Sequence, residues 1–326
     1  MAAERARELD HEHRKRLRPA LPMLLSMRYL TRALGRRLRG TQPVQAASVP
    51  RPAPGTMSIT FVGHATVMLT TATARLLVDP LLENSLLGVR RAKAAALAPD
   101  DLDDVDLVLV THAHRDHLSK KSLARLSRVG QLVLPPGCGS LVRGLGFAEV
   151  VELDPGARFK RGEVEVTAVP VRHSGTRGLG DYARRGAGGY VVRAADVTAY
   201  VAGDTGYFSG FAEIGRRFRP DVALLPIGGY EPAAFREEHL SPLDAIYAFE
   251  DLGARILVPT SYGSFPLSYE PLDAPLAWLR QLAQPRGLLG GAANPRAADA
   301  RFLAVLDHGE TIHVRGRAAS APASAA

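Results

Sequence analysis

Residues 107–118 have the sequence LVLVTHAHRDHL, an apolar run followed by a cluster of histidines. The run 107–110 is short and continuous, which predicts a buried strand. The loop after it carries three imidazoles and a carboxylate, namely His112, His114, Asp116 and His117. Neutral imidazole and carboxylate are the usual ligands of zinc and related divalent metals, so the pattern predicts a metal site. The alternative interpretation is a histidine-rich surface loop.

The spacing of these side chains predicts two neighbouring binding points. His112 and His114 can reach one point, because alternate side chains lie on the same side of an extended segment. Asp116 and His117 lie on the turn that follows and can reach a second point.

Other polar residues also follow short apolar stretches. His173 comes after 163–169, whose alternation predicts a half-buried strand, and Asp204 and Ser261 come after further apolar runs. Loops held by a rigid scaffold commonly carry functional sites, so these residues predict a single site at one edge of the sheets. Taken singly, His173 is an ordinary loop residue and Asp204 a turn-forming aspartate.

Length and composition are those of a globular protein. The chain has 326 residues, of which 46% are hydrophobic and 23% charged, enough for one large domain or two ordinary ones. The single Cys138 excludes an intrachain disulfide framework and a cysteine-rich zinc site. No run of about 18 apolar residues occurs, so no transmembrane helix is predicted.

The net charge of +8 is concentrated in the first 40 residues. They hold eleven basic and four acidic residues, a net charge of +7, which leaves about +1 for the rest. A nucleic-acid enzyme carries its basic patch around the site, so no nucleic-acid partner is expected. Residues 22–39 predict a basic amphipathic helix, which either lies on an anionic membrane or packs on the protein's own surface.

These features predict three segments. Residues 1–56 form a basic N-terminal arm with the amphipathic helix and a Pro-rich linker, 57–315 form the folded domain, and 316–326 form a disordered tail. Within the folded domain, the pattern predicts a helix over 242–252 with Ser241 as its N-cap, and a closing hairpin formed by 302–306 and 311–314. We expect a cytoplasmic protein, with peripheral membrane contact if the arm binds lipid.

The pattern HxHxDH at 112–117 resembles the signature of the metallo-β-lactamase superfamily. The stretches FVGHATV (61–67), AGDTGYFSGFAEIGRRF (202–218) and PIGGYEP (226–232) resemble its N-acyl-phosphatidylethanolamine phospholipase D-like branch. The L-ascorbate-6-phosphate lactonase branch is a more distant likeness. The resemblance covers roughly residues 57–270 and implies an α/β fold, a four-layer αββα sandwich, usually with a dinuclear metal centre.

The resemblance also implies roles for individual residues. One or two zinc ions, or another divalent metal, would be bound by His112, His114 and His173 at site one and by Asp116 and His117 at site two, with Asp204 bridging. Asp116 and His239 would be catalytic, although His239 is also interpretable as a surface histidine before a helix. His64 and Asp79 would orient the metal loop. The substrate would contact Tyr230, Glu231 and Tyr262.

The sequence departs from the family pattern at one ligand position. The family has a last site-two histidine in a stretch HWGTF or HYGTF, and this chain has SYGSF at 261–265, so Ser261 stands at that position. A serine hydroxyl is a poor zinc ligand beside imidazole. The departure predicts a weak second metal, a single-metal hydrolase, or a catalytically silent binder, and the sequence identifies none of His239, Glu238 and Glu270 as a replacement ligand.

The function implied is a metal-dependent hydrolase. The reaction that the resemblance implies is that of a phosphodiesterase of phospholipase D type, acting on an N-acylated phospholipid or a related phosphodiester, with a small-molecule or phospholipid substrate attacked by metal-activated water. The alternatives are a lactonase or other carbonyl hydrolase on the same centre, and a catalytically impaired metal-binding homologue because of Ser261.

Overall fold

The computed structural model describes residue 35 and residues 40–47, 49–97, 99–126, 130–178, 184–289 and 300–317. The predicted amphipathic helix at 22–39, apart from Gly35, lies outside the described residues, and so does the predicted tail from residue 318 onward. Among the described residues we find no helix with the length and apolarity that a membrane span requires.

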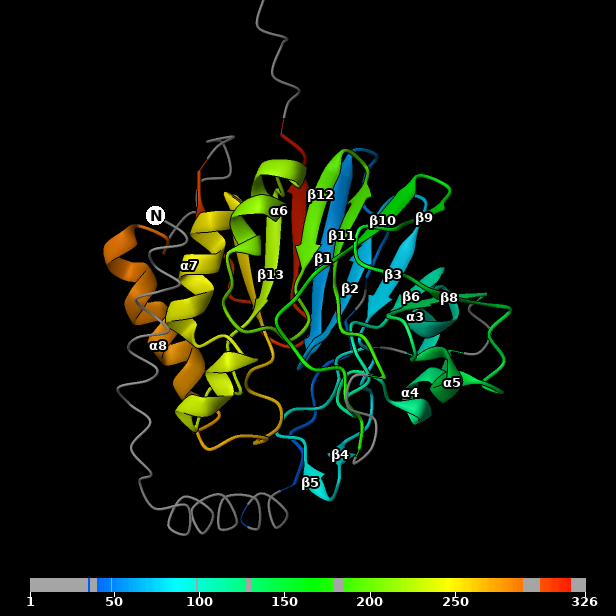
Figure 1. Ribbon diagram of the computed structural model, residues 1–326, viewed down its shortest axis with the longest axis horizontal. Helices are drawn as coiled ribbons and strands as arrows, with labels where there is room; N and C mark the ends of the chain where they lie inside the picture. Colours follow the sequence, from blue (N-terminus) through cyan, green and yellow to red (C-terminus); the bar gives the residue numbers. More distant parts are fainter. Residues whose placement is uncertain are drawn as a thin grey trace, which may run out of the picture.

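Two seven-stranded sheets face each other in the described part of the chain (Figure 1). The first has the order β16 (Thr311–Arg315), β1 (Thr56–Gly63), β2 (Thr66–Thr70), β3 (Arg75–Val78), β6 (Leu107–Leu109), β7 (Gln131–Leu134) and β8 (Glu149–Glu152). The second has the order β15 (Phe302–Leu303), β14 (Ile256–Thr260), β13 (Val222–Pro226), β12 (Val197–Val201), β11 (Gly189–Ala194), β10 (Val164–Val169) and β9 (Arg158–Arg161).

Both sheets are mixed, and this sets where the loops meet. In the first sheet β3, β6, β7 and β8 run parallel. In the second sheet β12, β13, β14 and β15 run parallel, and β10 has the same direction because two antiparallel pairings separate it from β12. The carboxyl ends of parallel strands lie at the same edge of a sheet, so the loops after β6, β10, β12 and β14 can converge.

Helices cover the outer face of each sheet, which completes the four layers (Figure 1). The second sheet is covered by α6 (Gly210–Phe218), α7 (Pro242–Leu252) and α8 (Ala274–Ala283), followed by the 3-10 helix η2 (Gln284–Arg286). The first sheet is covered by α3 (Pro99–Asp103), α4 (Lys120–Arg125) and α5 (Gly139–Val142). The predicted αββα sandwich is therefore confirmed.

The core lies between the sheets, and each outer face has an apolar cluster of its own. Ile59 and Leu109 of the first sheet belong to the same central cluster as Val166 and Leu224 of the second. Strands β6 and β13 are apolar throughout and buried along their length, as expected of strands covered on both faces. A small separate hairpin, β4 (Ser85–Leu86) with β5 (Val89–Arg90), precedes α3.

The predicted hairpin near the C-terminus is wrong. Strand β15 pairs with β14 in the second sheet, and β16 pairs with β1 in the first, so the chain crosses from one sheet to the other between them. Both stretches have strand-like composition, but their partners are far away in the sequence. The connecting turn is held by His308, whose ring contacts the Ser264 hydroxyl at 3.0 Å.

Part of the segment predicted as a linker packs on the body. Gln42 and Ala47 form parallel bridges with Lys93 and Leu97. The side chains of Ala47 and Val49 are buried in the apolar cluster under α3 and α4. The chain therefore contacts the domain before the first strand begins.

Candidate metal centre

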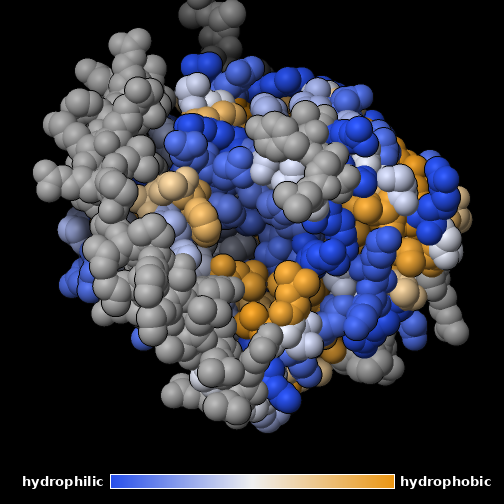
Figure 2. All heavy atoms as spheres, turned by 60° about the horizontal axis from the view of Figure 1, so that its bottom comes forward, coloured by the Kyte–Doolittle hydropathy of each residue, from blue (hydrophilic) through white to orange (hydrophobic). Residues whose placement is uncertain are grey.

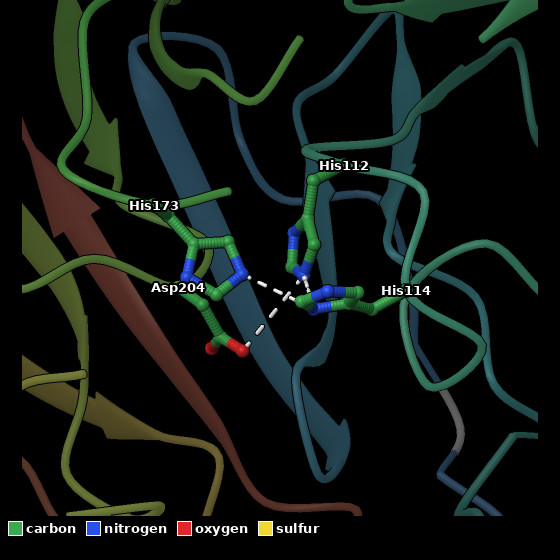
Figure 3. A group of neighbouring side chains, drawn as sticks. All are labelled: His112, His114, His173 and Asp204. Atoms are coloured by element: carbon green, nitrogen blue, oxygen red, sulfur yellow. Dashed lines mark hydrogen bonds and ion pairs between the residues drawn. The ribbon is translucent and has the colours of Figure 1, made fainter. Parts of the chain in front are cut away.

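Four predicted ligands converge between the two sheets (Figure 3). His112 and His114 come from the loop after β6, His173 from the loop after β10, and Asp204 from the loop after β12. Each offers one ligand atom, and these atoms lie within 4.8 Å of one another. His114 Nδ1 is 3.0 Å from His112 Nε2 and 3.1 Å from His173 Nε2. Asp204 Oδ2 is 3.9 Å from His112 Nε2.

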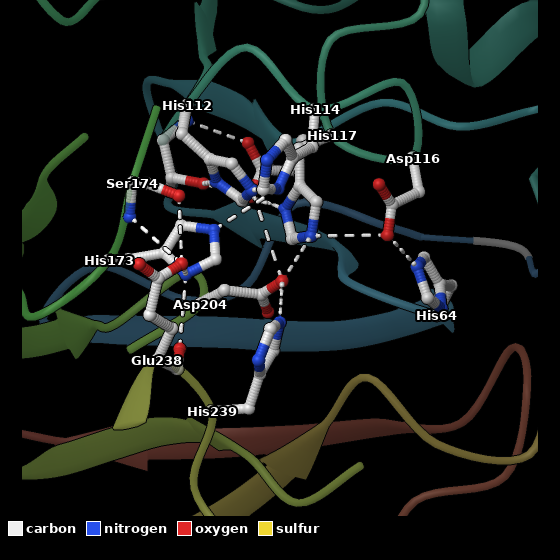
Figure 4. A network of polar contacts seen from close by, with 12 residues as sticks. His64, His112, His114, Asp116, His117, His173, Ser174, Asp204, Glu238 and His239 are labelled. Atoms are coloured by element: carbon white, nitrogen blue, oxygen red, sulfur yellow. Dashed lines mark hydrogen bonds and ion pairs between the residues drawn. The ribbon is translucent and has the colours of Figure 1, made fainter. Parts of the chain in front are cut away.

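A second group lies beside the first and consists of His64, Asp116 and His117 (Figure 4). His64 comes from the turn between β1 and β2, and the other two come from the loop after β6. Asp116 Oδ2 is 3.0 Å from His64 Nε2 and 3.6 Å from His117 Nε2. His117 Nε2 is in turn 3.2 Å from Asp204 Oδ2, so Asp204 faces both groups.

Asp79 and Thr111 fix the orientation of two of these rings. Asp79 accepts from the Thr111 N–H at 2.8 Å and from the Thr111 hydroxyl at 2.7 Å, and His117 Nδ1 is 2.8 Å from the same carboxylate. Because the Thr111 hydroxyl donates its proton to the hydrogen bond with Asp79, the hydroxyl oxygen accepts a hydrogen bond from His112 Nδ1 at 3.0 Å. These partners assign a proton to Nδ1 of His112 and to Nδ1 of His117. The Nε2 atoms of the two rings then face the centre without a proton.

Backbone carbonyls fix two further rings in the same way. His173 Nδ1 is 3.0 Å from the carbonyl oxygen of Glu238, and His239 Nδ1 is 3.1 Å from that of Phe235. Both carbonyl oxygens accept a hydrogen bond from Nδ1–H, so each Nε2 carries a free lone pair in the neutral ring. His239 Nε2 lies 3.7 Å from Asp204 Oδ2.

The site-one imidazoles are held in the neutral form. Burial lowers the pKa of His112 well below its usual value and lowers that of His114. Burial also lowers the pKa of His173, to about 4, with neighbouring histidines acting in the same direction and Asp204 opposing. A metal binds the neutral imidazole, so protons compete weakly at these three positions near neutral pH.

His117 and the carboxylates behave in the opposite way. Burial would lower the pKa of His117, but Asp204, Asp79 and Asp116 raise it well above its usual value. Burial would raise the pKa of Asp204, but the nearby charge of His117 holds it well below its usual range. The surroundings of His117 Nε2 therefore favour a positive charge, which is what a divalent cation provides.

The donor set fits a metal. His117 Nε2 is buried and has no hydrogen-bond partner among the described residues, although carboxylate oxygens of Asp116 and Asp204 lie close to it. In site one, His114 Nδ1 lies at hydrogen-bond distance from the Nε2 atoms of both His112 and His173. Neutral imidazoles whose lone pairs converge in this way lack donors for one another, and a shared cation satisfies them all.

Ser261 stands at the edge of this centre with a buried hydroxyl. Its Oγ has no hydrogen-bond partner within the described ranges, and its backbone has a left-handed φ of 57°. Its N–H donates to the carbonyl oxygen of His64 at 2.9 Å. The side chain at the position where the resemblance implied a histidine ligand therefore makes no polar contact among the described residues.

A cavity opens over the two groups. Its wall includes His64, His114, Asp116, Asp204, His239, Ser261 and Tyr262. Figure 2 shows this end of the molecule, where a hollow lies between hydrophilic side chains and a hydrophobic patch. The structure does not bring Tyr230 and Glu231 to the cavity wall. Tyr230 instead packs on Trp278, with ring centroids 5.5 Å apart.

Sequence reasoning missed two residues that shape the site. Thr111 orients His112, and its place beside the metal loop was the only signal available. Glu270 is buried and accepts from the N–H groups of Gly229 at 2.6 Å and Glu231 at 3.2 Å, which fixes the loop after β13. Nothing in the sequence around Glu270 indicates this contact.

Residues 74–262 match the family model described as Beta-lactamase superfamily domain, which is more than half of the chain. The chain belongs to this family. The metallo-β-lactamase resemblance is thereby confirmed, and membership places the chain among metal-dependent hydrolases.

Similar proteins agree with this assignment. A metal-dependent hydrolase of Caldivirga maquilingensis is 32% identical over 213 residues, covering 63% of this chain and 82% of that protein. An N-acyl-phosphatidylethanolamine-hydrolyzing phospholipase D of Caenorhabditis elegans is 29% identical over 228 residues, covering 64% of each. The structure of Igni18, a metallo hydrolase of Ignicoccus hospitalis, superposes with a TM-score of 0.58 at 23% identity, covering 80% of this chain and 99% of that one, which supports the fold.

Proposed function

We propose that this metal-dependent hydrolase is a phosphodiesterase of phospholipase D type, acting on an N-acylated phospholipid or a related phosphodiester. The observation that carries the proposal is the pair of adjacent donor groups that share Asp204. Paired metal sites suit displacement at phosphorus, because two neighbouring charges can contact the attacking and the leaving oxygen. The likeness to the nematode phospholipase supports the same reaction class.

In this proposal His112, His114 and His173 would hold one metal, Asp116 and His117 would hold a second, and Asp204 would be shared between them. The donor set of imidazoles and carboxylates suits zinc. A bound divalent metal supplies an activated water and stabilises negative charge on the phosphoryl oxygens. Asp79 keeps His117 in the ligating tautomer through the 2.8 Å contact to Nδ1.

The other proposed catalytic groups face the cavity. His239 presents Nε2 to the cavity, and when this atom carries a proton it can donate it to a phosphoryl or leaving-group oxygen. Asp116 presents a carboxylate that can orient the attacking water. Tyr262 lines the same wall and is held by a hydrogen bond from its hydroxyl to the carbonyl oxygen of Leu306 at 2.7 Å, which suits a substrate-contacting role.

The test is hydrolysis of N-acyl-phosphatidylethanolamine by the zinc-loaded protein, with lactones and carboxylic esters as competing substrates. We expect release of phosphatidate, and a loss of at least about 100-fold in the His114→Ala variant. The His239→Gln variant should keep its metal and lose turnover by about 100-fold or more. His313→Ala is the matched control, because His313 lies on β16 and contacts Ser58 of β1, away from the metal centre. Turnover of lactones alone, or undiminished turnover by His114→Ala, contradicts the proposal.

Ser261 motivates a second candidate, a metal-binding homologue with little activity. Its hydroxyl is buried without a partner among the described residues, so it supplies no visible replacement for the missing imidazole. Under this candidate the wild-type protein is inactive on every substrate class and the Ser261→His variant gains activity. Rapid turnover by the wild type excludes it.

We further propose that residues 57–315 are the catalytic domain of a cytoplasmic protein and that the basic segment 22–39 brings this domain to anionic membranes. The charge of +7 in the first 40 residues supports this, since each basic residue near such a surface contributes about 1 kcal/mol. The test deletes residues 1–39 and keeps Ala47 and Val49, which pack on the body. Binding to phosphatidylserine vesicles should fall while hydrolysis of a soluble phosphodiester persists. Unchanged vesicle binding contradicts the membrane role.

A further inference from the structure

The second donor group lacks one ligand when it is counted from the family pattern. Asp116 and His117 lie together, and Asp204 reaches them, but the last position is Ser261. The Ser261 hydroxyl contacts no polar atom in the part of the chain that the structure describes. A zinc ion with only these protein donors would be weakly held, because a serine hydroxyl does not replace an imidazole.

A different histidine, His64, lies beside the donor group that lacks this ligand. His64 Nε2 is 3.0 Å from Asp116 Oδ2, and the ligand atoms of His64, Asp116 and His117 lie within 4.8 Å of one another (Figure 4). Around a tetrahedral zinc with bonds of about 2.0–2.1 Å, neighbouring ligand atoms are about 3.3 Å apart. The contacts of 3.0 Å and 3.6 Å to Asp116 and of 3.2 Å from His117 to Asp204 bracket that value.

An unpartnered atom points into the same space. His117 Nε2 is buried and makes no hydrogen bond to any described residue, while Asp79 occupies Nδ1 on the other side of the ring. We propose that His64 is a ligand of the second metal and replaces the histidine that is missing at position 261. The inference rests on the metal centre of the proposed function and adds to it the protein ligand that completes site two.

The loop at 261–265 also holds His64 in place. The His64 N–H donates to the hydroxyl of Ser264 at 2.8 Å, and its carbonyl oxygen accepts from the Ser261 N–H at 2.9 Å. The ring packs edge-on against Phe265, with centroids 5.5 Å apart. His64 has a left-handed φ of 61°, so the turn between β1 and β2 directs the side chain toward the centre at some cost in backbone strain.

His239 is the other histidine near the centre, and it fits less well. Its Nε2 lies 3.7 Å from Asp204, whereas His64 Nε2 lies 3.0 Å from Asp116, the carboxylate that belongs to the second group alone. His64 therefore has the better position for site two, and His239 remains available to the substrate.

A rival role for His64 is a hydrogen bond that only orients Asp116, and the variant is chosen to separate the two roles. In His64→Gln the amide can still donate to Asp116, but it is a poor zinc ligand. We expect the wild type to bind about two zinc ions per chain and His64→Gln about one. Affinity for the second ion should fall by more than about 100-fold, beyond the usual effect of a residue that only supports a ligand. His313→Gln, on β16 and away from the centre, is the control and should bind as the wild type does.

A second variant tests whether the two positions substitute for each other. The Ser261→His/His64→Gln double variant has an imidazole at the family position, and we expect it to regain the second zinc ion. If His64 only orients Asp116, Ser261→His raises the second-site affinity by the same factor with and without His64→Gln, whereas a ligand role makes the gain much larger in the His64→Gln background. Metal content, cobalt absorption spectra and competition with a chelating dye measure the number of bound ions and the affinity for the second ion. None of these measurements depends on enzymatic activity.

A zinc-loaded crystal of the wild type gives a measurement that does not depend on any variant folding. We expect His64 Nε2 at about 2.1 Å from the second ion. A distance above 3 Å, a second-site affinity unchanged in His64→Gln, or a wild type that binds only one ion overturns the role of His64 and leaves the proposed hydrolase standing. A wild type that binds no metal at all overturns the proposed function as well.

Discussion

At the scale of single residues, Asp79 contacts two residues of the centre without lining the cavity. It accepts from both donors of Thr111 and contacts His117 Nδ1 at 2.8 Å. In Asp79→Asn an amide NH₂ replaces one of these acceptors, and His117 is then driven to carry its proton on Nε2, the metal-facing atom. We expect metal affinity to fall about 10–100-fold, measured by zinc competition titration.

The control for this substitution is Asp196→Asn. Asp79 and Asp196 both have left-handed backbones, with φ of 43° and 61°, and asparagine tolerates that region, so both variants should fold. Asp196 is exposed in the turn between β11 and β12 and touches no ligand. Equal affinity in Asp79→Asn and Asp196→Asn would show that Asp79 does not set the tautomer of His117.

Most of the centre was predictable from residues, and the exceptions have a common cause. The histidines of 112–117 and the strand before them are neighbours in the sequence, so their pattern is local. Glu270 acts on Gly229, 41 positions away, through a loop that has no periodicity to read. The contact of His64 with Asp116 likewise depends on the turn between β1 and β2 packing against the loop at 261–264, and no local signal reports that packing.

At the scale of elements, the start of α7 links the second sheet to the loop that carries His239. Ser241 accepts from the N–H of Asp244, and the Asp244 carboxylate accepts from the N–H of Ser241, a complete capping box. We expect Ser241→Ala to lower the free energy of unfolding of the metal-free protein by about 1 kcal/mol in urea denaturation. Ser209→Ala is the control, because Ser209 caps α6 without a side-chain hydrogen bond and should change little. Equal losses in the two variants would contradict the capping role.

The turn that carries the chain from one sheet to the other contains a histidine with a shifted pKa. Burial lowers the pKa of His308 to about 4, helped by the charge of Arg91 and opposed by Asp307. The unfolded chain has the ordinary value of about 6.5 and binds the proton first, so this histidine costs stability as the pH falls from about 6.5 to 4.

We therefore expect the metal-free wild type to lose roughly 1–3 kcal/mol more than His308→Gln between pH 7 and pH 4. Glutamine can keep the hydrogen bond to Ser264, so the two proteins should be close in stability at pH 7. Urea unfolding at a series of pH values measures the difference. Parallel pH profiles for the two proteins would mean that His308 titrates normally in the fold.

One helix and one pair of strands show which elements a local sequence pattern can and cannot predict. The helix at 242–252 was predicted with its cap, because amphipathic spacing and the Ser–Pro start are both local. The hairpin at 302–314 was predicted wrongly, because strand composition does not specify the partner. Strand β15 has two residues and pairs with β14, and β16 completes the first sheet beside β1.

At the scale of the whole molecule, the centre joins the two sheets. His64, His112, His114, Asp116 and His117 come from loops of the first sheet, and His173 and Asp204 come from loops of the second. Without a cation this edge of the sandwich brings buried carboxylates and imidazoles together with few donors between them. A metal bound to ligands of both sheets would therefore stabilise the packing of one sheet on the other, as well as supplying the chemistry of the proposed function.

We expect removal of the metal by a chelator to lower the melting temperature, and added zinc to restore it. At free zinc about 1,000-fold above the dissociation constant the stabilisation is about 4 kcal/mol, which corresponds to a rise of roughly 10 °C for a domain of this size. Scanning calorimetry at several zinc concentrations measures it. Asp204→Asn should lose most of the response, because Asp204 faces both donor groups, while Asp196→Asn should keep it. A melting temperature that does not depend on zinc would mean that the two sheets are held together by their apolar core alone.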